Sequence, residues 1–451
     1  MSAAAKMLSD SVDDLALRVS DFGHSSPAYD QLFEGYARLG LQPGSAILIL
    51  APNSVEFLFH WLAVIANGCV PCAVAPATKA VVVTALRKSL GIAAVAGPRL
   101  DPARHQAKRF ARIGAFDVAV CDEIPPPYEP FQVLVLTTGT SGSQTACVHS
   151  LNSLVWNAGM TNKALNINSA DRQLVVLPMY HSYALITQSI GSIIGGCELR
   201  IDGPPFSPNR FADLVRDERI SVCGITPTIA RDLLRRRSAL PGVRAISIGG
   251  DRVSPEEVGS LLAQPFISEL YITYGLTEAG PRVSVLPAHD APTDAYDSVG
   301  TAFSGVVTRI EEPDADGVGQ LLVKTPSACV RRVGAQVESQ PFTSDGFLKT
   351  GDLFTKDASG YLRYVARRAE ILIVKGEKVN TRSIDLVVQS HPDVEFARTA
   401  QGEADSLVTR VWAKDDKSLD LEGIRSFMKA SLRLHELPDR LVQQDRDVFH
   451  K

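Results

Sequence analysis

An alternation of apolar segments near the start of the chain constrains the fold most strongly. Residues 46–51 (A-I-L-I-L-A) are typical of a buried strand, residues 55–66 of a buried helix, and residues 69–74 of a second strand. The same rhythm recurs over residues 80–96. Strands and helices that alternate in this way pair in parallel through crossover helices. The sequence therefore predicts an α/β fold.

The rest of the chain extends this pattern and then departs from it. Short strands punctuated by Gly over residues 299–365 are typical of a β-rich subdomain. We expect a large N-terminal domain over residues 1–366, with parallel-type sheets, flanking helices and this subdomain. We expect a small α+β C-terminal domain over residues 367–451. Further strands are expected at 174–177, 220–225, 243–248 and 270–273, and helices at 29–41 and 151–165.

The composition is that of an ordinary globular enzyme. Of the 451 residues, 45% are apolar and 21% charged, and the net charge of −4 gives no attraction to nucleic acid or to an anionic membrane. We therefore expect neither as a partner. No apolar run reaches the ~18 residues that span a bilayer, and the N-terminus lacks the pattern of a signal peptide. Seven scattered Cys favour reduced thiols and a cytoplasmic location.

Three short motifs are interpreted as structural. Cys69 and Cys72 form a C-x-x-C pair inside an apolar segment, which favours packing over redox or zinc chemistry. The charges at residues 235–237 favour a solvated helix face over a nucleic-acid patch. Residues 402–407 resemble the Asp-Ser-Leu of a carrier protein, but residues 407–412 alternate like a strand, so a turn is favoured.

A loop rich in Gly and hydroxyl residues follows an apolar strand at residues 133–136. It runs from Thr137 to Ser143 and contains Gly139 and Gly142. Such a loop wraps backbone N–H groups around an anion, and its hydroxyls add donors to phosphate or ligands to magnesium. The alternative is an ordinary surface loop. The P-loop and dinucleotide-binding patterns are both absent, so the loop belongs to another kind of nucleotide site or to none.

Several other polar residues follow apolar strands. In α/β sheets, ligands bind at the carboxyl ends of the strands. His181, Gly249-Gly250-Asp251 and Tyr274 to Glu278 all follow such segments. Tyr274 offers an aromatic face for a base and Glu278 a carboxylate for magnesium. Asp352 follows a tight turn and suits the two hydroxyls of a ribose, and Arg367 suits the same ribose or a phosphate.

These segments together resemble the adenylate-forming (AMP-binding) enzymes, which include acyl- and aryl-CoA synthetases, peptide-synthetase adenylation domains and luciferases. The resemblance runs from about Tyr29 to the C-terminus. The matching segments are 137–146 (phosphate loop), 177–181 (Pro-x-x-His), 274–278 (Y-G-L-T-E), 350–352 (T-G-D), and 366–370 with 376–379 (hinge and first C-terminal strand). Their number and order make the resemblance specific.

The resemblance implies a reaction in two halves. A carboxylate attacks the α-phosphate of Mg·ATP to give an acyl-adenylate and pyrophosphate. A thiol of coenzyme A, or of a phosphopantetheine carrier protein, then displaces AMP, and the mobile C-terminal domain rotates between the halves. The implied cofactors are ATP/AMP and Mg²⁺, with coenzyme A or a carrier as co-substrate.

The resemblance also implies a role for each matched residue. Thr277 contacts the α-phosphate, and Glu278 holds magnesium together with Thr140. His181 lies between the acyl pocket and the reacting carboxylate; its alternative is a hydrogen-bonded core histidine. The remaining nucleotide contacts are Thr138, Gly139, Thr140, Ser141 and Gly142 (β- and γ-phosphates), Tyr274 and Gly275 (adenine), Gly249, Gly250 and Asp251 (adenine edge), and Asp352 and Arg367 (ribose).

The chain departs from the family pattern at three places. Gln144-Thr145-Ala146 replaces Pro-Lys-Gly at the end of the phosphate loop, which removes a charge-assisted contact of ~1.5–3 kcal/mol. Ala369 replaces Asp or Lys at the hinge. The catalytic Lys of a C-terminal Gly-Lys pair is missing in a shortened C-terminal domain, and Lys451 is a candidate substitute. Such a loss typically costs ~10²–10³ in rate, so slow adenylation is expected.

The acid and its acceptor are only partly constrained. Amino-acid-activating relatives carry an Asp where this chain has His181-Ser182, so an ordinary α-amino acid is disfavoured. The side chains that indicate an apolar acyl or aryl group are Tyr183, Ala184, Leu185 and Ile225. We expect an acid–thiol ligase for a small carboxylic acid, with coenzyme A or a separate carrier protein as acceptor. The alternatives are an impaired or half-reaction member that binds nucleotide or acyl-adenylate, and an amide- or ester-forming ligase.

Overall fold

The computed structural model describes residues 3–10, 18–21, 29–121, 127–137, 145–235, 241–334, 340–374, 377–402, 406–414 and 418–444. It divides into two compact units. The larger contains Met1–Arg309, Leu322–Thr350 and Lys356–Arg363, and the smaller contains Ile310–Leu321, Gly351–Thr355 and Tyr364–Lys451. The expected domain boundary between residues 366 and 367 stays a prediction.

One eight-stranded sheet of the larger unit contains the predicted strand–helix–strand segments. Its order is β18 (Arg331–Gly334), β8 (Thr145–Ser150), β7 (Gln132–Thr137), β3 (Val70–Val74), β2 (Ala46–Leu50), β4 (Ile92–Gly97), β6 (Phe116–Val120) and β5 (Arg109–Ile113). β7, β3, β2 and β4 pair in parallel, which confirms the crossover prediction. Helix α4 (Val55–Ala66) joins β2 to β3 and begins at Ser54, whose hydroxyl accepts from the Phe57 N–H. Helix α5 (Ala80–Leu90) joins β3 to β4.

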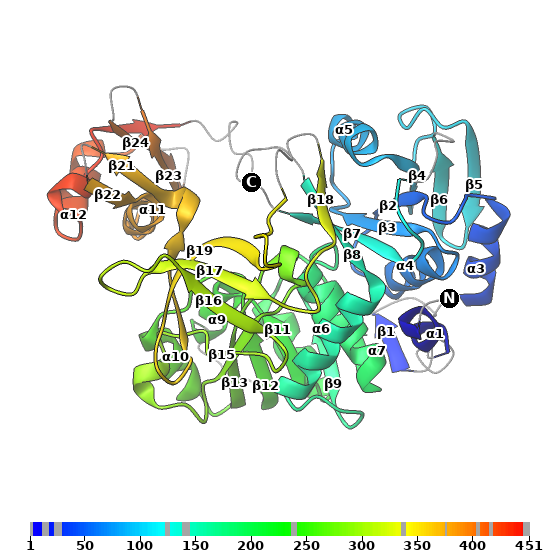
Figure 1. The fold of residues 1–451 in the computed structure, drawn as a ribbon, viewed down its shortest axis with the longest axis horizontal. Helices are drawn as coiled ribbons and strands as arrows, with labels where there is room; N and C mark the ends of the chain where they lie inside the picture. The colour runs from blue at the N-terminus through cyan, green and yellow to red at the C-terminus, as the bar shows by residue number, and fades with distance from the viewer. Residues whose placement is uncertain are drawn as a thin grey trace. The chain divides into compact units, whose positions relative to one another are not determined.

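The second eight-stranded sheet is parallel over its first six strands. Its order is β1 (Val19–Asp21), β10 (Glu198–Ile201), β9 (Arg172–Val175), β11 (Val222–Ile225), β12 (Val243–Ile248), β13 (Ile267–Tyr274), β14 (Ser284–Pro287) and β15 (Thr301–Ala302). β14 and β15 add in antiparallel orientation. β9, β11, β12 and β13 lie side by side in Figure 1. The strands expected at 174–177, 220–225, 243–248 and 270–273 all belong to this sheet.

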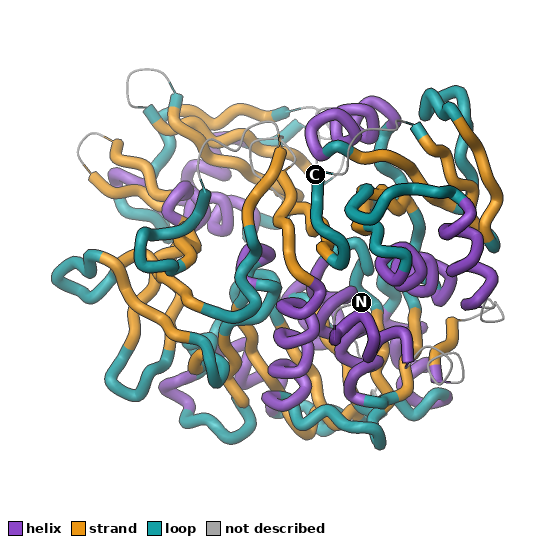
Figure 2. Tube along the Cα trace, turned by 45° about the vertical axis from the view of Figure 1, so that its right-hand side comes forward, coloured by secondary structure: helices purple, strands orange, loops and turns teal. Residues whose placement is uncertain are grey.

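Three helices between these strands begin in the same way. α8 (Pro208–Asp217), α9 (Pro227–Leu234) and α10 (Pro255–Leu262) each start with Pro, preceded by a Ser or Thr whose hydroxyl accepts an N–H of the first turn. Pro at the first position costs no hydrogen bond, because that N–H has no partner within a helix. The other helices of the unit are α1 (Ala3–Asp10), α3 (Tyr29–Arg38), α6 (Leu151–Ala164) and α7 (Gly191–Gly195). Figure 2 shows the resulting alternation of helix and strand.

The apolar stretch before α7 forms an unusual element. Residues Tyr183–Ile190 form a π-helix rather than the first turns of an α-helix. Hydroxyls line it, because Thr187 Oγ1 donates to the Tyr183 carbonyl at 2.6 Å and Ser189 Oγ to the Ala184 carbonyl at 3.0 Å. π-helical turns are rare and occur most often at functional sites.

Buried side chains of the larger unit form one main apolar core. Its largest members include Trp61, Phe57 and Phe59 of α4, all fully buried. All seven cysteines are buried and none forms a disulfide, so Cys69 and Cys72 pack as the sequence predicted. No helix in the described ranges combines the length and apolarity needed to cross a membrane.

The smaller unit has its own core of apolar side chains. A hairpin of β21 (Ile371–Val374) and β22 (Glu377–Asn380) leads into α11 (Thr381–Gln389), which packs with β23 (Val394–Gln401). A three-stranded sheet has the order β23, β24 (Leu407–Ala413), β25 (Arg440–Gln443), and α12 (Leu421–Lys429) lies between β24 and β25 in the chain. The strand predicted at residues 407–412 is therefore confirmed.

A four-stranded sheet contains residues assigned to both units. Its order is β16 (Val307–Glu311), β17 (Gly319–Lys324), β19 (Leu348–Lys356) and β20 (Leu362–Arg367). It confirms the β-rich segment predicted near residues 299–365. Among the described residues, short 3₁₀ turns occur at η2 (Thr277–Ala279), η3 (Thr293–Ala295), η4 (Arg368–Glu370) and η6 (Leu434–Glu436).

Candidate active site

The Tyr274–Glu278 motif forms a tight turn at the end of β13. β13 ends at Tyr274, η2 begins at Thr277, and Gly280 follows in the left-handed region with φ of 73°. Gly275 permits the turn, because a Cβ there would lie 1.7 Å from the Pro281 carbonyl oxygen. The Val283 N–H donates to the Tyr274 carbonyl at 2.9 Å, so the chain doubles back at once into β14.

A buried histidine forms a hydrogen bond with the backbone of this turn. His149 lies in β8 and is fully buried, and its Nε2 is 2.9 Å from the Thr277 carbonyl oxygen. Burial lowers the pKa of His149 to about 4, so the ring is neutral and Nε2 donates to the carbonyl. The sequence analysis missed His149. The only signal was a lone histidine inside the apolar run A-C-V-H.

An asparagine and a serine also form hydrogen bonds with the backbone of the turn. Asn157 of α6 donates from Nδ2 to the Arg282 carbonyl at 2.8 Å and accepts from the Arg282 N–H at 3.1 Å. Its Nδ2 also donates to Ser327 Oγ at 3.0 Å, and Ser327 Oγ donates to the Ala279 carbonyl at 2.6 Å. These buried bonds satisfy the backbone on both sides of Gly280, which fixes the turn. Neither residue was predicted from the sequence.

The Glu278 carboxylate lies in this turn with no partner in the described part of the chain. It is half-buried, and it makes no hydrogen bond or ion pair with any described residue, although its backbone carbonyl accepts from the Cys329 N–H at 2.8 Å. Magnesium is usually bound through one or two carboxylates together with water and substrate phosphates. The described residues contain no group of three or more His, Cys, Asp or Glu that would hold a metal by themselves. A single free carboxylate therefore fits a phosphate-bound magnesium ion.

The Gly-rich loop lies outside the described residues, together with the predicted contacts Thr138, Gly139, Thr140, Ser141 and Gly142. Its two flanks are described. Thr137 and Thr145 are paired at the end of the antiparallel β7–β8 hairpin, and their Oγ1 atoms are 2.6 Å apart. The loop is therefore followed by a strand and not by a helix, which agrees with the prediction that it is not an ordinary P-loop.

The Gly249-Gly250-Asp251 segment follows β12, the strand next to β13. Ile248 pairs with Ile272, so this segment and Tyr274 lie at the same end of the sheet, as predicted. Gly249 is buried, and a Cβ on it would lie 2.5 Å from Thr273 Oγ1 and 2.8 Å from Arg282 Nη1. Asp251 is exposed and accepts the Arg252 N–H at 2.8 Å.

His181 lies between β9 and the π-helix. Its backbone N–H donates to the Pro178 carbonyl at 3.0 Å, and its carbonyl accepts the Leu185 N–H at 3.0 Å. The ring is exposed and lies against Tyr180, with ring centroids 4.5 Å apart. Partial desolvation lowers the pKa of His181. The imidazole makes no hydrogen bond with the described residues, so the alternative of a hydrogen-bonded core histidine is wrong.

Asp352 and Arg367, the predicted ribose contacts, meet within the smaller unit. Arg367 Nε donates to Asp352 Oδ1 at 3.0 Å, and the carboxylate is buried whereas the guanidinium is half-exposed. The structure thus brings together two residues that the sequence analysis assigned to one ligand. That they share a nucleotide with Tyr274 and Glu278 stays a prediction. Lys451 lies outside the described residues.

The chain is similar to known proteins over most of its length. A profile of the family described as "AMP-binding enzyme" matches residues 29–330. A sulfoacetate–CoA ligase of Cupriavidus necator is 28% identical over 83% of this chain and 78% of its own length. A feruloyl-CoA synthase of an Amycolatopsis species is 24% identical over 92% of this chain and 88% of its own.

Solved structures show the same fold. An o-succinylbenzoate CoA synthetase of Bacillus subtilis, in complex with its acyl-adenylate intermediate, superposes with a TM-score of 0.83 at 19% identity. The match covers 98% of this chain and 94% of that one. The α/β fold predicted from the sequence is thereby confirmed.

Proposed function

Because this chain belongs to the family of AMP-binding enzymes, we propose that it is an AMP-forming ligase that joins a small carboxylic acid to coenzyme A. The adenylate-forming resemblance found in the sequence is confirmed by the family match. The curated relatives reported above carry acid–CoA ligase names, which supports coenzyme A over a carrier protein as the acceptor. A cytoplasmic location remains part of the proposal, supported by seven buried cysteines that form no disulfide.

In the proposed first half-reaction, a carboxylate oxygen of the acid bonds to the α-phosphorus of ATP and pyrophosphate leaves. Tyr274 stacks on adenine, Thr277 contacts the α-phosphate, and Glu278 binds the magnesium ion. Magnesium, when bound, neutralises charge on the phosphates. In the second half-reaction, the thiolate of coenzyme A bonds to the acyl carbon and AMP leaves with the C–O bonding electrons.

The remaining roles follow the sequence predictions. Asp352 and Arg367 bind the ribose, and the hydroxyls and N–H groups of residues 138–142 bind the outer phosphates. His181, exposed beside the π-helix, lies next to the acid. The observation that carries the proposal is Glu278: a carboxylate with no partner among the described residues, in a turn whose backbone is fixed by His149, Asn157 and Ser327.

Carboxylate-dependent exchange of labelled pyrophosphate into ATP tests the first half-reaction, and mass detection of the CoA thioester tests the second. We expect both with at least one acid of a broad panel. Absence of exchange with every acid would contradict the proposal. Formation of an amide or ester with an amine or alcohol in place of the thioester would instead favour the third sequence hypothesis.

One observation favours an impaired member as the second candidate. Thr145, at the position of the family's phosphate-loop Lys, bonds Thr137 within the hairpin and brings no positive charge. That candidate predicts ATP or AMP binding without turnover. Titration calorimetry of ATP, beside the exchange assay on the same protein sample, separates the two functions.

A further inference from the structure

Arg282, four residues after Glu278, has a buried guanidinium with unused donors. Its side chain is only 3% exposed, and its Nε and Nη2 have no hydrogen-bond partner in the part of the chain that the structure describes. The guanidinium lies over the Tyr183 ring, with Cζ 3.6 Å from the ring centroid. This stacking fixes the plane of the guanidinium but leaves its edge free to donate.

The position of Arg282 is fixed by its own backbone. Both its N–H and its carbonyl bond the Asn157 side chain, at 3.1 and 2.8 Å. A buried arginine on a fixed backbone, with no carboxylate among its described contacts, is costly, because desolvation is not offset by an opposite charge. Burial also lowers the pKa of Arg282. The arrangement is explained if the opposite charge arrives with a ligand.

The surroundings of Arg282 are closely packed and include small residues of the sheet. The Tyr183 hydroxyl bonds Ser247 Oγ at 2.9 Å, and a Cβ on Gly224 would lie 2.9 Å from both that hydroxyl and Gln188 Nε2. Gly224 pairs with Ser247, and Gly249 follows on the same face of the sheet. These small residues therefore make room on the sheet face for the side chains of Tyr183, Gln188 and Arg282.

In the part of the chain that the structure describes, the unsatisfied buried atoms beside Tyr183 are all donors. Gln188 Nε2 is buried without a partner, as are Nε and Nη2 of Arg282, whereas Gln188 Oε1 accepts from Gln173 at 3.4 Å. A ligand that satisfies them must bring acceptors and negative charge. Tyr183, which lies against the guanidinium, is half-buried, and His181, two residues earlier, is exposed.

We propose that Arg282 binds a second anionic group of the acid, a carboxylate or a sulfonate, so that the enzyme selects small acids with two anionic groups. The proposal rests on the proposed ligase function and names its substrate class. It revises the apolar pocket expected from Tyr183, Ala184, Leu185 and Ile225. Of these, Ala184, Leu185 and Ile225 belong to the main apolar core, and Tyr183 stacks on the guanidinium.

The test uses the full chain with Mg·ATP and coenzyme A. Dicarboxylic acids and sulfo-carboxylic acids with a backbone of three to six non-hydrogen atoms are each compared with the monocarboxylic acid of equal length. AMP release and the mass of the thioester are the readouts. We expect kcat/KM at least ~10- to 100-fold higher for one dianionic series, since a charge-assisted pair is at stake. The two series distinguish carboxylate from sulfonate.

Arg282→Gln and Arg282→Lys show whether this residue sets the preference. Arg282→Gln should lower the ratio of kcat/KM for the dianionic acid to kcat/KM for the monocarboxylic acid ~10-fold or more, mainly through KM, and cause no loss of Tm. Arg282→Lys should keep part of the preference. Arg216→Gln, at an exposed ion pair with Asp213, is the matched control and should change nothing.

Each outcome separates the inference from the proposed function. Turnover with equal or better use of monocarboxylic acids would overturn the inference and leave the ligase function intact. A fall in Tm of Arg282→Gln with unchanged acid preference would show a merely structural arginine. If no acid turns over, the proposed ligase function is wrong. The inference is then tested by calorimetry of the dianionic acids, in the presence of AMP, with wild type and with Arg282→Gln. Equal affinity of the two proteins for these acids would overturn the inference.

Discussion

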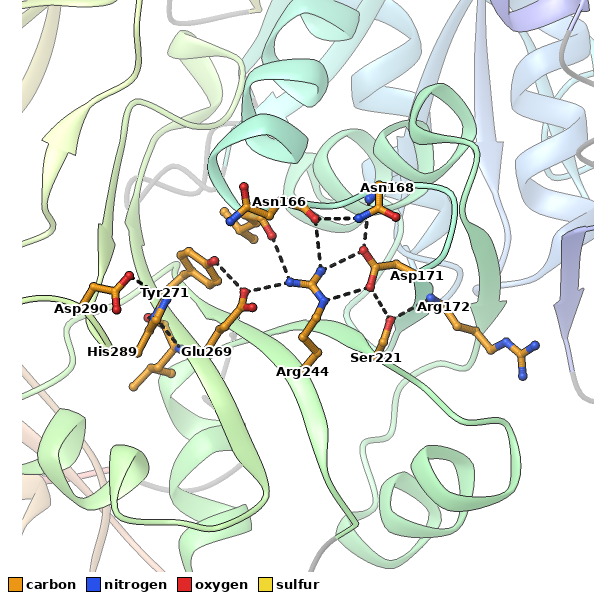
Figure 3. A network of polar contacts seen from close by, with 12 residues as sticks. Asn166, Asn168, Asp171, Arg172, Ser221, Arg244, Glu269, Tyr271, His289 and Asp290 are labelled. Atoms are coloured by element: carbon orange, nitrogen blue, oxygen red, sulfur yellow. Dashed lines mark hydrogen bonds and ion pairs between the residues drawn. The ribbon is translucent and has the colours of Figure 1, made fainter.

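Two arginines near opposite ends of strand β12 differ in the partners of their guanidinium groups. Arg244, at the start of the strand, is shared by two carboxylates: its Nε and Nη2 bond Asp171 at 3.0 and 2.8 Å, and its Nη1 bonds Glu269 at 2.8 Å (Figure 3). Each carboxylate also accepts a hydrogen bond from a hydroxyl group. Ser221 Oγ donates to Asp171 at 2.7 Å, and the Tyr271 hydroxyl donates to Glu269 at 2.8 Å.

Arg282 lies beside Gly249, just after the other end of β12, and has no such carboxylate partners among the described residues. It is more deeply buried than Arg244, whose side chain is 28% exposed, yet it bonds no described carboxylate. A network in which each charge is satisfied stabilises the sheet, whereas an isolated buried cation destabilises it. The difference indicates that the Arg244 end of the sheet is structural and that the Arg282 end is prepared for a ligand.

Breaking the satisfied network should have the largest effect. Arg244→Met leaves Asp171, only 6% exposed, without its cation, and we expect a loss of ~3–5 kcal/mol in the free energy of unfolding. Urea denaturation of the variant measures this loss. Arg282→Gln is the comparison variant, and a loss of similar size in both would remove the distinction between the two ends.

Removing the unpaired anion should cost activity instead of stability. Glu278→Gln has almost the same shape and breaks no described bond of the carboxylate, so the urea midpoint should stay unchanged. We expect kcat to fall ~10²–10³-fold, because charge stabilisation in the transition state is lost. Steady-state AMP release at saturating magnesium measures the fall. A variant with full activity would show that Glu278 binds no catalytic metal.

His149 should make the stability of the turn depend on pH. Its folded pKa of about 4 lies below the ordinary 6.5, so between these values the unfolded state binds more protons. Stability is therefore fully present above pH 6.5 and falls toward pH 4, by up to about 3 kcal/mol. Unfolding curves over this range measure the slope, and His149→Gln should flatten it. An unchanged slope in the variant would assign the dependence to other groups.

The smallest effect is expected at the edge of the Gly-rich loop. Thr145→Lys restores a cation at the family's Lys position and replaces the contact with Thr137. We expect ATP to bind ~10-fold more tightly, since one charge-assisted contact is gained. Titration calorimetry measures the change. Thr145→Met, uncharged and of comparable length, should bind ATP no more tightly than wild type.

Local signals explain what was predicted well. The helix expected at residues 55–66 was right at both ends, because Ser54 caps it and the apolar run is continuous. The strand at residues 243–248 was also right at both ends, because its apolar run is bounded by Gly. The π-helix at residues 183–190 was not predicted, because its apolar sequence is equally suited to an α-helix and its wider turn depends on packing.

The sequence alone determined the family and the chemically active motifs, because these depend on residue types in a fixed order. It also predicts that Tyr274, Glu278, Asp352 and Arg367 contact a nucleotide. Only the tertiary structure decided which charges are satisfied. His149 and Arg282 look ordinary in sequence, and their importance comes from burial among residues more than a hundred positions away. Burial and long-range pairing depend on how distant strands meet, which no local pattern specifies.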